Sequence, residues 1–408
     1  MYRWPRFGHS AEVASLNYHS KLREGLRVDG PTHDKRIQIE DHLKHDFKAA
    51  RWSIPEDFLS YSHFYRVVMD LDFNSSPGYP YCKSYTTNRI LFQVSDEGQP
   101  SESRLMMMWE QVVNRLKDRT CDPVRLFVKP EPLKEKKIKN KAYRLISSVS
   151  VLDQIIDALL FGPMNKALIK NYQSVPAKVG WSPYVGGWKT MPTRGWLATD
   201  KSGWDWSVQM WLVEMEFQLR KDLCKNMSPL WLELAEWRYW NLFCNAEFIT
   251  SGGMLLKQNW EGVMKSGSYN TITTNSIMQH ILHLRVCYDL GQRVGSLMAM
   301  GDDVLQERPD ELEPYLDYLA QFCHVKSSLE TSEFAGHRFT DRYIEPLYRG
   351  KHAFMLLHMN TRYIDQLSDS YSLLYHRSRK RGFIRRLFTE MGVEPASLSA
   401  LDVVYDGE

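Results

Sequence analysis

Two adjacent aspartates in the C-terminal half of the chain could form part of a metal site. Asp302 and Asp303 follow Gly301, and short apolar runs lie on both sides of this tripeptide. We expect a β-hairpin with both carboxylates at its tip, because glycine tolerates the backbone conformation of a tight turn. Adjacent carboxylates repel each other unless a cation lies between them, and their hard oxygen atoms suit Mg²⁺. Gly-Asp turns are common, so an ordinary turn is the alternative interpretation.

A second pair of aspartates lies upstream. Asp200 follows the apolar residues 196–198 and can therefore end a strand, whereas Asp205 lies beyond Gly203, where the chain can turn back. Acids on two separate strands can share a pair of metal ions. Asp205 alone would be interpreted as a helix N-cap, since apolar residues with helical spacing follow it over 208–227. That interpretation leaves Asp200 unexplained.

A hydroxyl-rich loop lies between these two acidic pairs. Residues 265–276 read KSGSYNTITTNS, and an apolar helical stretch follows over 277–290. Backbone N–H groups and short hydroxyl side chains at the start of a helix can bind a phosphate or a ribose. The alternative is a helix cap rich in Ser and Thr, and the order of the three segments along the chain argues against it.

The order of these segments resembles motifs A, B and C of viral RNA-dependent RNA polymerases. The pattern is D-x4-D, then SG-x3-T-x3-NS, then GDD, and the likeness extends over residues 75–339. The strings SGWDWSV, KSGSYNT and MAMGDD are most similar to those of the sobemovirus and polerovirus group of positive-strand RNA viruses. The resemblance implies template-directed transfer of nucleotides from NTPs to an RNA 3′-OH.

The resemblance implies a role for each polar residue of the three motifs. Two Mg²⁺ or Mn²⁺ ions would be held by Asp200, Asp302 and Asp303. One ion would lower the pKa of the 3′-OH, and the other would stabilise the leaving pyrophosphate. The ribose 2′-OH both donates and accepts hydrogen bonds. Its pocket would be formed by Asp205, Ser266, Thr271 and Asn275.

A proton donor for the pyrophosphate is also implied. The family has a motif D lysine after the helix that follows GDD, and Lys326 is the only lysine between Asp303 and Lys351. It follows a helix that we expect near residues 309–322. A surface lysine in a loop is the alternative, and His324 is a rival acid with a lower intrinsic pKa.

A lysine-rich stretch over residues 127–146 resembles motif F, whose cations line the path of the incoming nucleotide. A triphosphate carries several negative charges and needs cations when it approaches an acidic centre. Lys129 and Arg144 flank the stretch beside apolar strands and would bind the triphosphate. Arg144 would do so through bidentate hydrogen bonds to phosphate oxygens. Several of the lysines between them are interpreted as solvated loop residues.

Two further segments resemble polymerase motifs. Residues 75–81, SSPGYPY, resemble motif G, in which Ser76 and Gly78 would contact the template strand. A turn rich in Pro and Gly is the alternative for this segment. Residues 334–339 resemble motif E, at the junction of palm and thumb.

The composition fits a large folded domain without a membrane span. With 408 residues, of which 43% are hydrophobic and 25% charged, the chain can bury a sizeable core. The net charge is only +3, so basic residues gather locally, over 129–144 and 377–386. The second cluster is expected to contact RNA, with a solvated helix face or a localisation signal as alternatives.

The six cysteines lack metal-site spacing and suit a reducing compartment. The most apolar stretch, 151–164, is interrupted by Asp153 and Asp157, so we expect no transmembrane segment.

The expected fold is α+β, a right-hand polymerase with an antiparallel palm sheet flanked by helices. The expected divisions are fingers over 1–193, a first part of the palm over 194–236, a fingers insertion over 237–263, a second part of the palm over 264–342 and a thumb over 343–408. Within the fingers we expect helices near 39–51 and 102–117 and strands near 89–94 and 125–128.

RNA-dependent RNA polymerase activity that replicates a viral RNA genome is the expected function. One alternative is a catalytically inactive, polymerase-like RNA-binding module, which fits less well because every required acid is present. The other is a reverse transcriptase, which would exclude the 2′-OH that Asp205 and Asn275 would bind. The expected partners are an RNA template, the product strand and NTPs, in membrane-associated replication complexes of the host cytoplasm. Initiation by a protein primer or de novo stays open, as does the oligomeric state.

Overall fold

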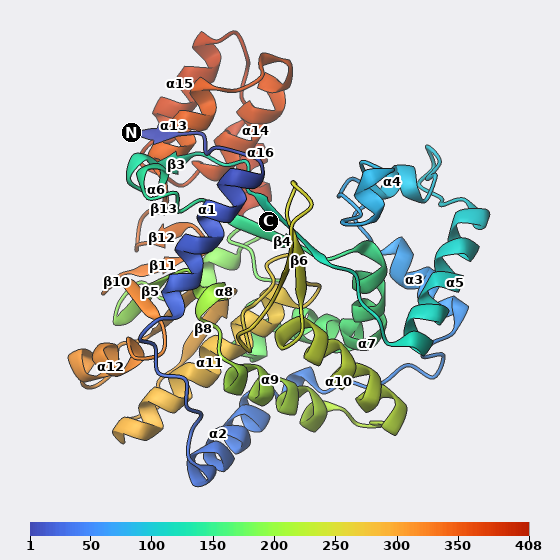
Figure 1. Cartoon of the computed structure of the whole chain (residues 1–408). Coiled ribbons are helices and arrows are strands. Elements are labelled where there is room, and N and C mark those ends of the chain that lie inside the picture. Colours follow the sequence, from blue (N-terminus) through green and yellow to red (C-terminus); the bar gives the residue numbers. More distant parts are fainter. Residues whose placement is uncertain (408) are drawn as a thin grey trace.

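The chain forms two arms that rise from a shared base (Figure 1). The computed structural model describes residues 1–407. One arm contains α3 (Tyr61–Met69), α4 (Asn88–Leu91) and α5 (Glu102–Asp118). The other arm contains α13 (Arg349–Leu357), α14 (Ile364–Leu374), α15 (Arg381–Glu390) and α16 (Leu398–Asp406). The base holds a four-stranded sheet with helices packed around it.

The sheet in the base has the strand order β10-β5-β9-β8, and every pairing in it is antiparallel. Its strands are β5 (Trp196–Ser202), β8 (Leu297–Met300), β9 (Asp303–Glu307) and β10 (His324–Leu329). Neighbouring residues point to opposite faces, so Val304 packs with Ala299 on one side, whereas Leu305 packs with Ala198 on the other. Two helices flank the sheet, α11 (Thr271–Leu290) and α12 (Leu312–Leu319). The expected antiparallel sheet flanked by helices is confirmed.

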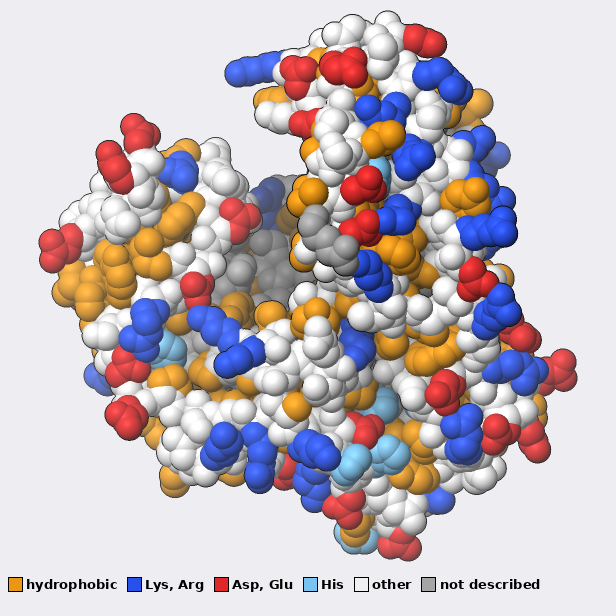
Figure 2. Space-filling view, turned by 180° about the vertical axis from the view of Figure 1, so that it is seen from behind, with side chains coloured by type: hydrophobic (Ala, Val, Ile, Leu, Met, Phe, Trp, Pro, Cys, Tyr) orange, Lys and Arg blue, Asp and Glu red, His pale blue; other side chains and the backbone are white. Residues whose placement is uncertain are grey.

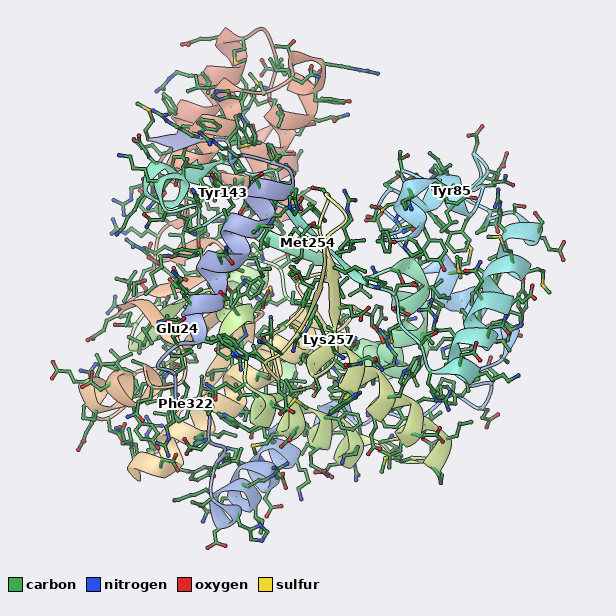
Figure 3. All side chains as sticks on the ribbon, in the orientation of Figure 1. Glu24, Tyr85, Tyr143, Met254, Lys257 and Phe322 are labelled. Atoms are coloured by element: carbon green, nitrogen blue, oxygen red, sulfur yellow. The ribbon has the colours of Figure 1, made fainter. Side chains whose placement is uncertain are left out.

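A second sheet joins segments that are far apart in the sequence. Its strand order is β4-β2-β6-β7. The strands are β2 (Val124–Val128), β4 (Leu145–Ser148), β6 (Glu247–Ile249) and β7 (Leu255–Lys257). β2 pairs antiparallel with β4 and parallel with β6, so the expected insertion shares a sheet with the N-terminal region. Its expected start at 237 falls inside α10 (Pro229–Phe243). Met254, in the turn between β6 and β7, lies between the two arms (Figure 3).

The most apolar stretch of the sequence forms a buried helix, α7 (Val151–Lys170). Its acidic residues have buried partners, because Asp153 pairs with Arg115 at 2.8 Å and Asp157 pairs with Arg238 at 2.6 Å. Pairing offsets the cost of burying a carboxylate, so the helix can run through the core. In the described part of the chain, no helix is both long enough and apolar enough to cross a bilayer.

The expected elements of the N-terminal region are present except for one strand. α5 and β2 match their expected ranges, and the helix expected over 39–51 is α2 (His33–Asp46). The strand expected near 89–94 is wrong, because this segment contains the short helix α4. Thr87 accepts a hydrogen bond from the Ile90 N–H, and this cap starts a helical turn where the apolar pattern suggested a strand.

The N-terminal segment lies along the lysine-rich stretch. β1 (Tyr2–Arg3) pairs with β3 (Leu133–Lys134) in antiparallel fashion. Tyr143 lies beside α1 (His9–Ser20), where the Ser15 hydroxyl donates to the Tyr143 backbone oxygen at 2.6 Å (Figure 3). The remaining α-helices and β-strands are α6 (Glu135–Lys139), α8 (Trp204–Ser207), α9 (Met210–Leu223), β11 (Ser332–Phe334), β12 (His337–Phe339) and β13 (Ile344–Pro346).

Candidate active site

The hairpin expected at residues 300–303 is present. Met300 pairs with Asp303 across the turn that joins β8 to β9. Gly301 has a φ of +66°, a backbone conformation that favours glycine. A Cβ placed there would meet no atom within 4 Å, so the preference comes from the backbone angle and not from a steric clash. Asp302 is exposed at the tip, whereas Asp303 begins β9 and is partly buried.

The register of β5 against β9 places Asp200 opposite Asp303. Thr199 pairs with Val304, so the next facing residues of these antiparallel strands are the two aspartates. Facing side chains have Cβ atoms about 4.5–5.5 Å apart. Burial, followed by the charges of Asp302 and Asp200, raises the pKa of Asp303 to about 6. The structure therefore brings the three carboxylates together, and we refer to them as the acidic cluster.

Lys326 contacts the acidic cluster from a strand, not from a surface loop. β10 pairs with β5, but its register shifts by one residue, because Val325 faces Lys201 and Ser327 faces Asp200. Lys326 is thus the extra residue of a β-bulge, a feature that redirects side chains near functional sites. Its Nζ forms an ion pair with the Asp200 carboxylate.

A second lysine beside the acidic cluster was missed by the sequence reasoning. Lys201 follows Asp200 on β5 and points to the opposite face of the strand, where it is 6% exposed. Its Nζ donates to the Thr199 hydroxyl at 3.3 Å. Burial lowers the pKa of Lys201, and the charges of Asp302 and Asp200 act in the opposite direction. The only signal in the sequence was a lysine next to a motif aspartate.

Asp205 and Asn275, the residues expected to bind the ribose 2′-OH, lie in contact, and we refer to them as the sugar pair after that expectation. Asn275 Nδ2 donates to Asp205 Oδ1 at 2.9 Å, and Trp204 Nε1 donates to Asn275 Oδ1 at 3.0 Å. Burial raises the pKa of Asp205 to about 6, while the hydrogen bond from Asn275 acts in the opposite direction. The amide is therefore held between two partners.

Ser266 and Thr271 bind backbone atoms around the loop before α11. The Ser266 hydroxyl accepts a hydrogen bond from the Ser147 N–H at 3.0 Å, which connects the loop to β4. The Thr271 hydroxyl donates to the backbone oxygens of Lys265 and Ser268, at 2.7 and 2.9 Å. Thr271 is the first residue of α11, but its hydroxyl donates to loop oxygens and caps no helix N–H, so the helix-cap interpretation does not describe it. Neither hydroxyl bonds to the sugar pair.

Ser276 connects α11 to the turn of the acidic cluster, and the sequence reasoning gave it no role. Its hydroxyl accepts a hydrogen bond from the Gly301 N–H at 2.8 Å and donates to the Ile272 backbone oxygen at 2.6 Å. A backbone N–H of the turn is thereby satisfied by a helix side chain, which fixes the tip relative to α11. The signal was present in the sequence as the last residue of the SG-x3-T-x3-NS pattern.

Lys129 and Arg144 converge on one carboxylate. Glu131 forms ion pairs with Arg144 at 3.1 Å and with Lys129 at 3.7 Å. Lys351 of α13 also pairs with Glu131, at 2.8 Å. This cluster therefore joins the lysine-rich stretch to the arm formed by α13 to α16.

Ser76 and Gly78 form a turn that packs against the start of α7. The Gly78 N–H donates to the Ser76 hydroxyl at 3.4 Å, and the Val151 N–H donates to the Pro77 backbone oxygen at 2.8 Å. Gly78 has a φ of +68°, and a Cβ there would lie 2.8 Å from the Val149 backbone oxygen. The turn interpretation explains these contacts, and contact with a template stays a prediction.

An antiparallel sheet that carries an acidic cluster at the base of two arms defines a right-hand polymerase, as expected. Among solved structures, the Sicinivirus 3Dpol RNA dependent RNA polymerase resembles the chain with a TM-score of 0.68 and 15% identity. The match covers 96% of this chain and 90% of that one. The family model of viral RNA-dependent RNA polymerases matches residues 40–325. The chain belongs to the viral RNA-dependent RNA polymerase family.

Relatives found by sequence confirm the likeness to the sobemovirus and polerovirus group. Protein P1-P2 of Pea enation mosaic virus-1 is 30% identical over 380 residues, covering 83% of this chain and 31% of that protein. Protein P1-P2 of Potato leafroll virus is 30% identical over 400 residues, covering 87% and 36%. Replicase polyprotein P2AB of Southern bean mosaic virus is 32% identical over 373 residues, covering 82% and 37%. The chain thus spans between 31% and 37% of the length of these relatives.

Proposed function

We propose that this chain copies an RNA template by transferring nucleotides from NTPs to an RNA 3′-OH, in the replication of a positive-strand viral genome. The observation that carries the proposal is the register of β5 and β9, which puts Asp200 opposite Asp303 beside the exposed Asp302. Family membership and fold favour this function over an inactive RNA-binding module and over a reverse transcriptase.

The acidic cluster fits two divalent cations. Its carboxylates are hard oxygen ligands, and burial together with like charges raises the pKa of Asp303. The Lys326 ammonium already neutralises Asp200, which indicates a position that favours positive charge. Mg²⁺ or Mn²⁺ held by the cluster would activate the 3′-OH and stabilise the pyrophosphate. Among residues 1–407, no three Asp, Glu, His or Cys side chains are already arranged as a metal site.

The sugar pair and the motif F cations would orient the nucleotide. Asp205 and Asn275 offer a carboxylate and an amide, which suit a 2′-OH that both donates and accepts. Arg144 is 56% exposed and can exchange Glu131 for phosphate oxygens, and its planar guanidinium favours two parallel contacts. Lys129 would supply a second positive charge to the same triphosphate.

Lys326 would protonate the departing pyrophosphate. Its position beside Asp200 places the ammonium next to the proposed metal ligands. The rival acid, His324, uses its Nε2 in a hydrogen bond to the Leu22 backbone oxygen at 2.5 Å. A positioned general acid contributes about 10²–10⁴-fold to a rate, so loss of Lys326 should slow incorporation measurably.

Basic residues on one arm support the proposed contact with RNA. Figure 2 shows Lys and Arg side chains gathered along the arm formed by α13 to α16. A cavity of about 690 Å³ beside this arm is lined by basic residues and by the acid Glu345, which pairs with two of them; the basic residues are Arg338, Arg349, Arg379 and Lys380. Arg377, from the same basic stretch, pairs with Asp406 and therefore supports the fold. Phosphate contacts of this kind are sequence-independent and weaken as salt rises.

We assign the fingers to residues 1–193 with an insertion at 237–263, the palm to 194–236 and 264–342, and the thumb to 343–408. With these divisions, all four strands of the base sheet lie in the palm. Template contacts by Ser76 and Gly78, and a location in membrane-associated replication complexes of the host cytoplasm, are further proposals from the family likeness.

Primer extension by the purified chain on a homopolymeric RNA template tests the proposed function. We expect incorporation of NTPs that requires Mg²⁺ or Mn²⁺ and that is lost in Asp302→Asn, while RNA binding persists. Incorporation by this variant within about tenfold of the wild type would contradict the metal assignment. Preference for dNTPs would favour reverse transcription, and RNA binding without incorporation would favour the inactive module.

A further inference from the structure

Lys326 forms the only ion pair with the acidic cluster among the described residues. Its partner is Asp200, and no ion pair within residues 1–407 involves Asp302 or Asp303. The other nearby lysine, Lys201, is buried on the far face of β5 and bonds to Thr199. The position beside Asp200 is therefore filled by an ammonium group in this structure.

We propose that Lys326 is the resident counter-ion of the metal-free active site, that divalent cations displace it from Asp200, and that the released ammonium then reaches the triphosphate. The inference rests on the proposed function, because it takes Asp200 as a metal ligand. It adds an order of events, in which the proton donor becomes free only when the metal position is filled.

The exposure of the two partners makes the exchange feasible. The Lys326 side chain is 54% exposed and the Asp200 side chain 43% exposed. Ion pairs with this exposure contribute little free energy, and a divalent cation attracts a carboxylate with twice the charge. Lys201 has no such freedom, because it is 6% exposed. Lys326 can therefore leave Asp200, whereas Lys201 stays buried on the far face of β5.

The β-bulge allows Lys326 to move without disturbing its strand. Val325 and Ser327 keep their partners on β5, whereas Lys326 is the additional residue between them. A bulged residue is left out of the regular strand pairing. The side chain can consequently turn away from Asp200 while β10 stays in the sheet.

Direct measurement of Mn²⁺ binding tests the exchange without relying on activity. Free Mn²⁺ is followed by electron paramagnetic resonance as it is titrated into the full chain, at constant pH and ionic strength, without NTP or RNA. We expect Lys326→Met to lower the Kd for Mn²⁺ by about two- to fivefold, which is the size of an exposed ion pair. Lys326→Gln serves as a second variant if the first does not fold.

Two controls separate a direct pair from the general effect of charge. Lys166 pairs with Asp70 at 2.5 Å, with side chains 67% and 59% exposed, so Lys166→Met removes a similar pair elsewhere. Lys137 of α6 forms no ion pair with an acid of the cluster, although partial burial and then the charge of Lys326 lower its pKa. We expect Lys166→Met to leave the Kd unchanged and Lys137→Met to change it less than Lys326→Met does.

Asp200→Asn separates failure of the inference from failure of the proposed function. Weaker Mn²⁺ binding by Asp200→Asn with tighter binding by Lys326→Met supports the exchange. Weaker binding by Asp200→Asn with unchanged binding by Lys326→Met, or an equal effect of Lys137→Met, overturns the exchange and leaves the metal site in place. Unchanged binding by Asp200→Asn overturns both.

Discussion

At the scale of single residues, Asp303 makes the folded protein less stable when it is ionised. Its pKa is raised from 3.8 to about 6, first by burial and then by the charges of Asp302 and Asp200. A raised pKa means that the folded state binds the proton more tightly than the unfolded state does. The stabilisation that this bound proton gives the folded state is complete below about pH 4 and is lost as the pH rises through 6. Above pH 6 the ionised group therefore costs folding free energy.

We expect Asp303→Asn to raise the free energy of unfolding at pH 7.5 by about 1–2 kcal/mol in the presence of EDTA. The gain should shrink at pH 5, because the wild-type carboxyl is then largely protonated. Thermal melts at the two pH values measure the difference. Asp118→Asn, which changes an exposed carboxylate of α5, is the control. A lower melting temperature for Asp303→Asn at pH 7.5 would contradict the repulsion argument.

The sugar pair makes a prediction about nucleotide choice. Asn275 donates to Asp205 and accepts from Trp204, so Asn275→Ala removes one proposed partner of the 2′-OH and leaves buried groups unpaired. We expect kcat/KM to fall more for NTPs than for dNTPs, by about 1–3 kcal/mol of transition-state free energy. Thr271→Ala is the comparison, since its hydroxyl binds the loop backbone and its loss should affect both sugars alike. Equal losses in Asn275→Ala would remove the assigned role.

At the scale of elements, one buried guanidinium joins three helices of the base. Arg220 of α9 pairs with Glu216 at 2.7 Å and donates to Asn165 of α7 at 3.1 Å and to Thr274 of α11 at 3.2 Å. Arg220→Met leaves Glu216 as an uncompensated buried charge. We expect a loss of about 3–5 kcal/mol in the free energy of unfolding, measured by denaturant titration.

A double variant provides the control for this loss. Arg220→Met combined with Glu216→Leu removes both charges, and buried pairs replaced by apolar residues often cost little. We expect the double variant to be more stable than Arg220→Met alone. A single variant within about 1 kcal/mol of the wild type would show that the three helices do not depend on this contact.

Elements with a strong local signal were predictable from the sequence, including the hairpin of β8 and β9, whereas the pairing of β2 with the distant strand β6 was not. The turn at Gly301 and the helix after residue 276 follow from glycine chemistry and apolar spacing. The segment 89–94 was mistaken for a strand because its apolar residues outweighed the cap at Thr87. The parallel pairing of β2 with β6 depends on tertiary packing, which no local pattern contains.

The same division applies to the candidate active site. The aspartates could be identified because their spacing resembles a family pattern. The ion pair of Lys326 with Asp200 depends on a one-residue register shift in β10, and the hydrogen bond from Gly301 to Ser276 depends on how α11 packs. Lys201 was missed because a strand sends adjacent side chains to opposite faces, and the sequence did not show which face was buried.

At the scale of the whole molecule, the N-terminal segment connects the lysine-rich stretch to the thumb-side arm. β1 pairs with β3. The centroid of the Trp4 ring lies 5.6 Å from that of Phe354, in α13, and 6.4 Å from that of His358, the residue after α13. The ion pair between Lys351 and Glu131 connects the same two regions. Together these contacts hold the N-terminal segment and the lysine-rich stretch against the thumb-side arm.

We expect Trp4→Ala to weaken these contacts with the thumb-side arm and to shorten the residence of the polymerase on RNA. Aromatic pairs contribute about 0.5–1.5 kcal/mol, so the fraction of full-length product after a heparin trap should fall by about two- to tenfold. Trp240→Ala is the matched control, because Trp240 is 57% exposed on α10. An unchanged fraction in Trp4→Ala would mean that the N-terminal segment does not help to retain RNA.

The strand order of the base sheet also has a consequence in time. β5 lies between β9 and β10, both of which come later in the chain, and Lys326 follows Asp200 by 126 positions. At roughly 5–20 residues per second, a ribosome needs about 6–25 s to bridge that distance. Until β9 is made, from Asp303 onwards, β5 has no neighbour on either edge, and until β10 is made one of its edges stays open. An unpaired strand edge is a template for aggregation. Synonymous codons that slow translation over residues 203–323 should therefore reduce the soluble yield of the protein while its specific activity stays the same.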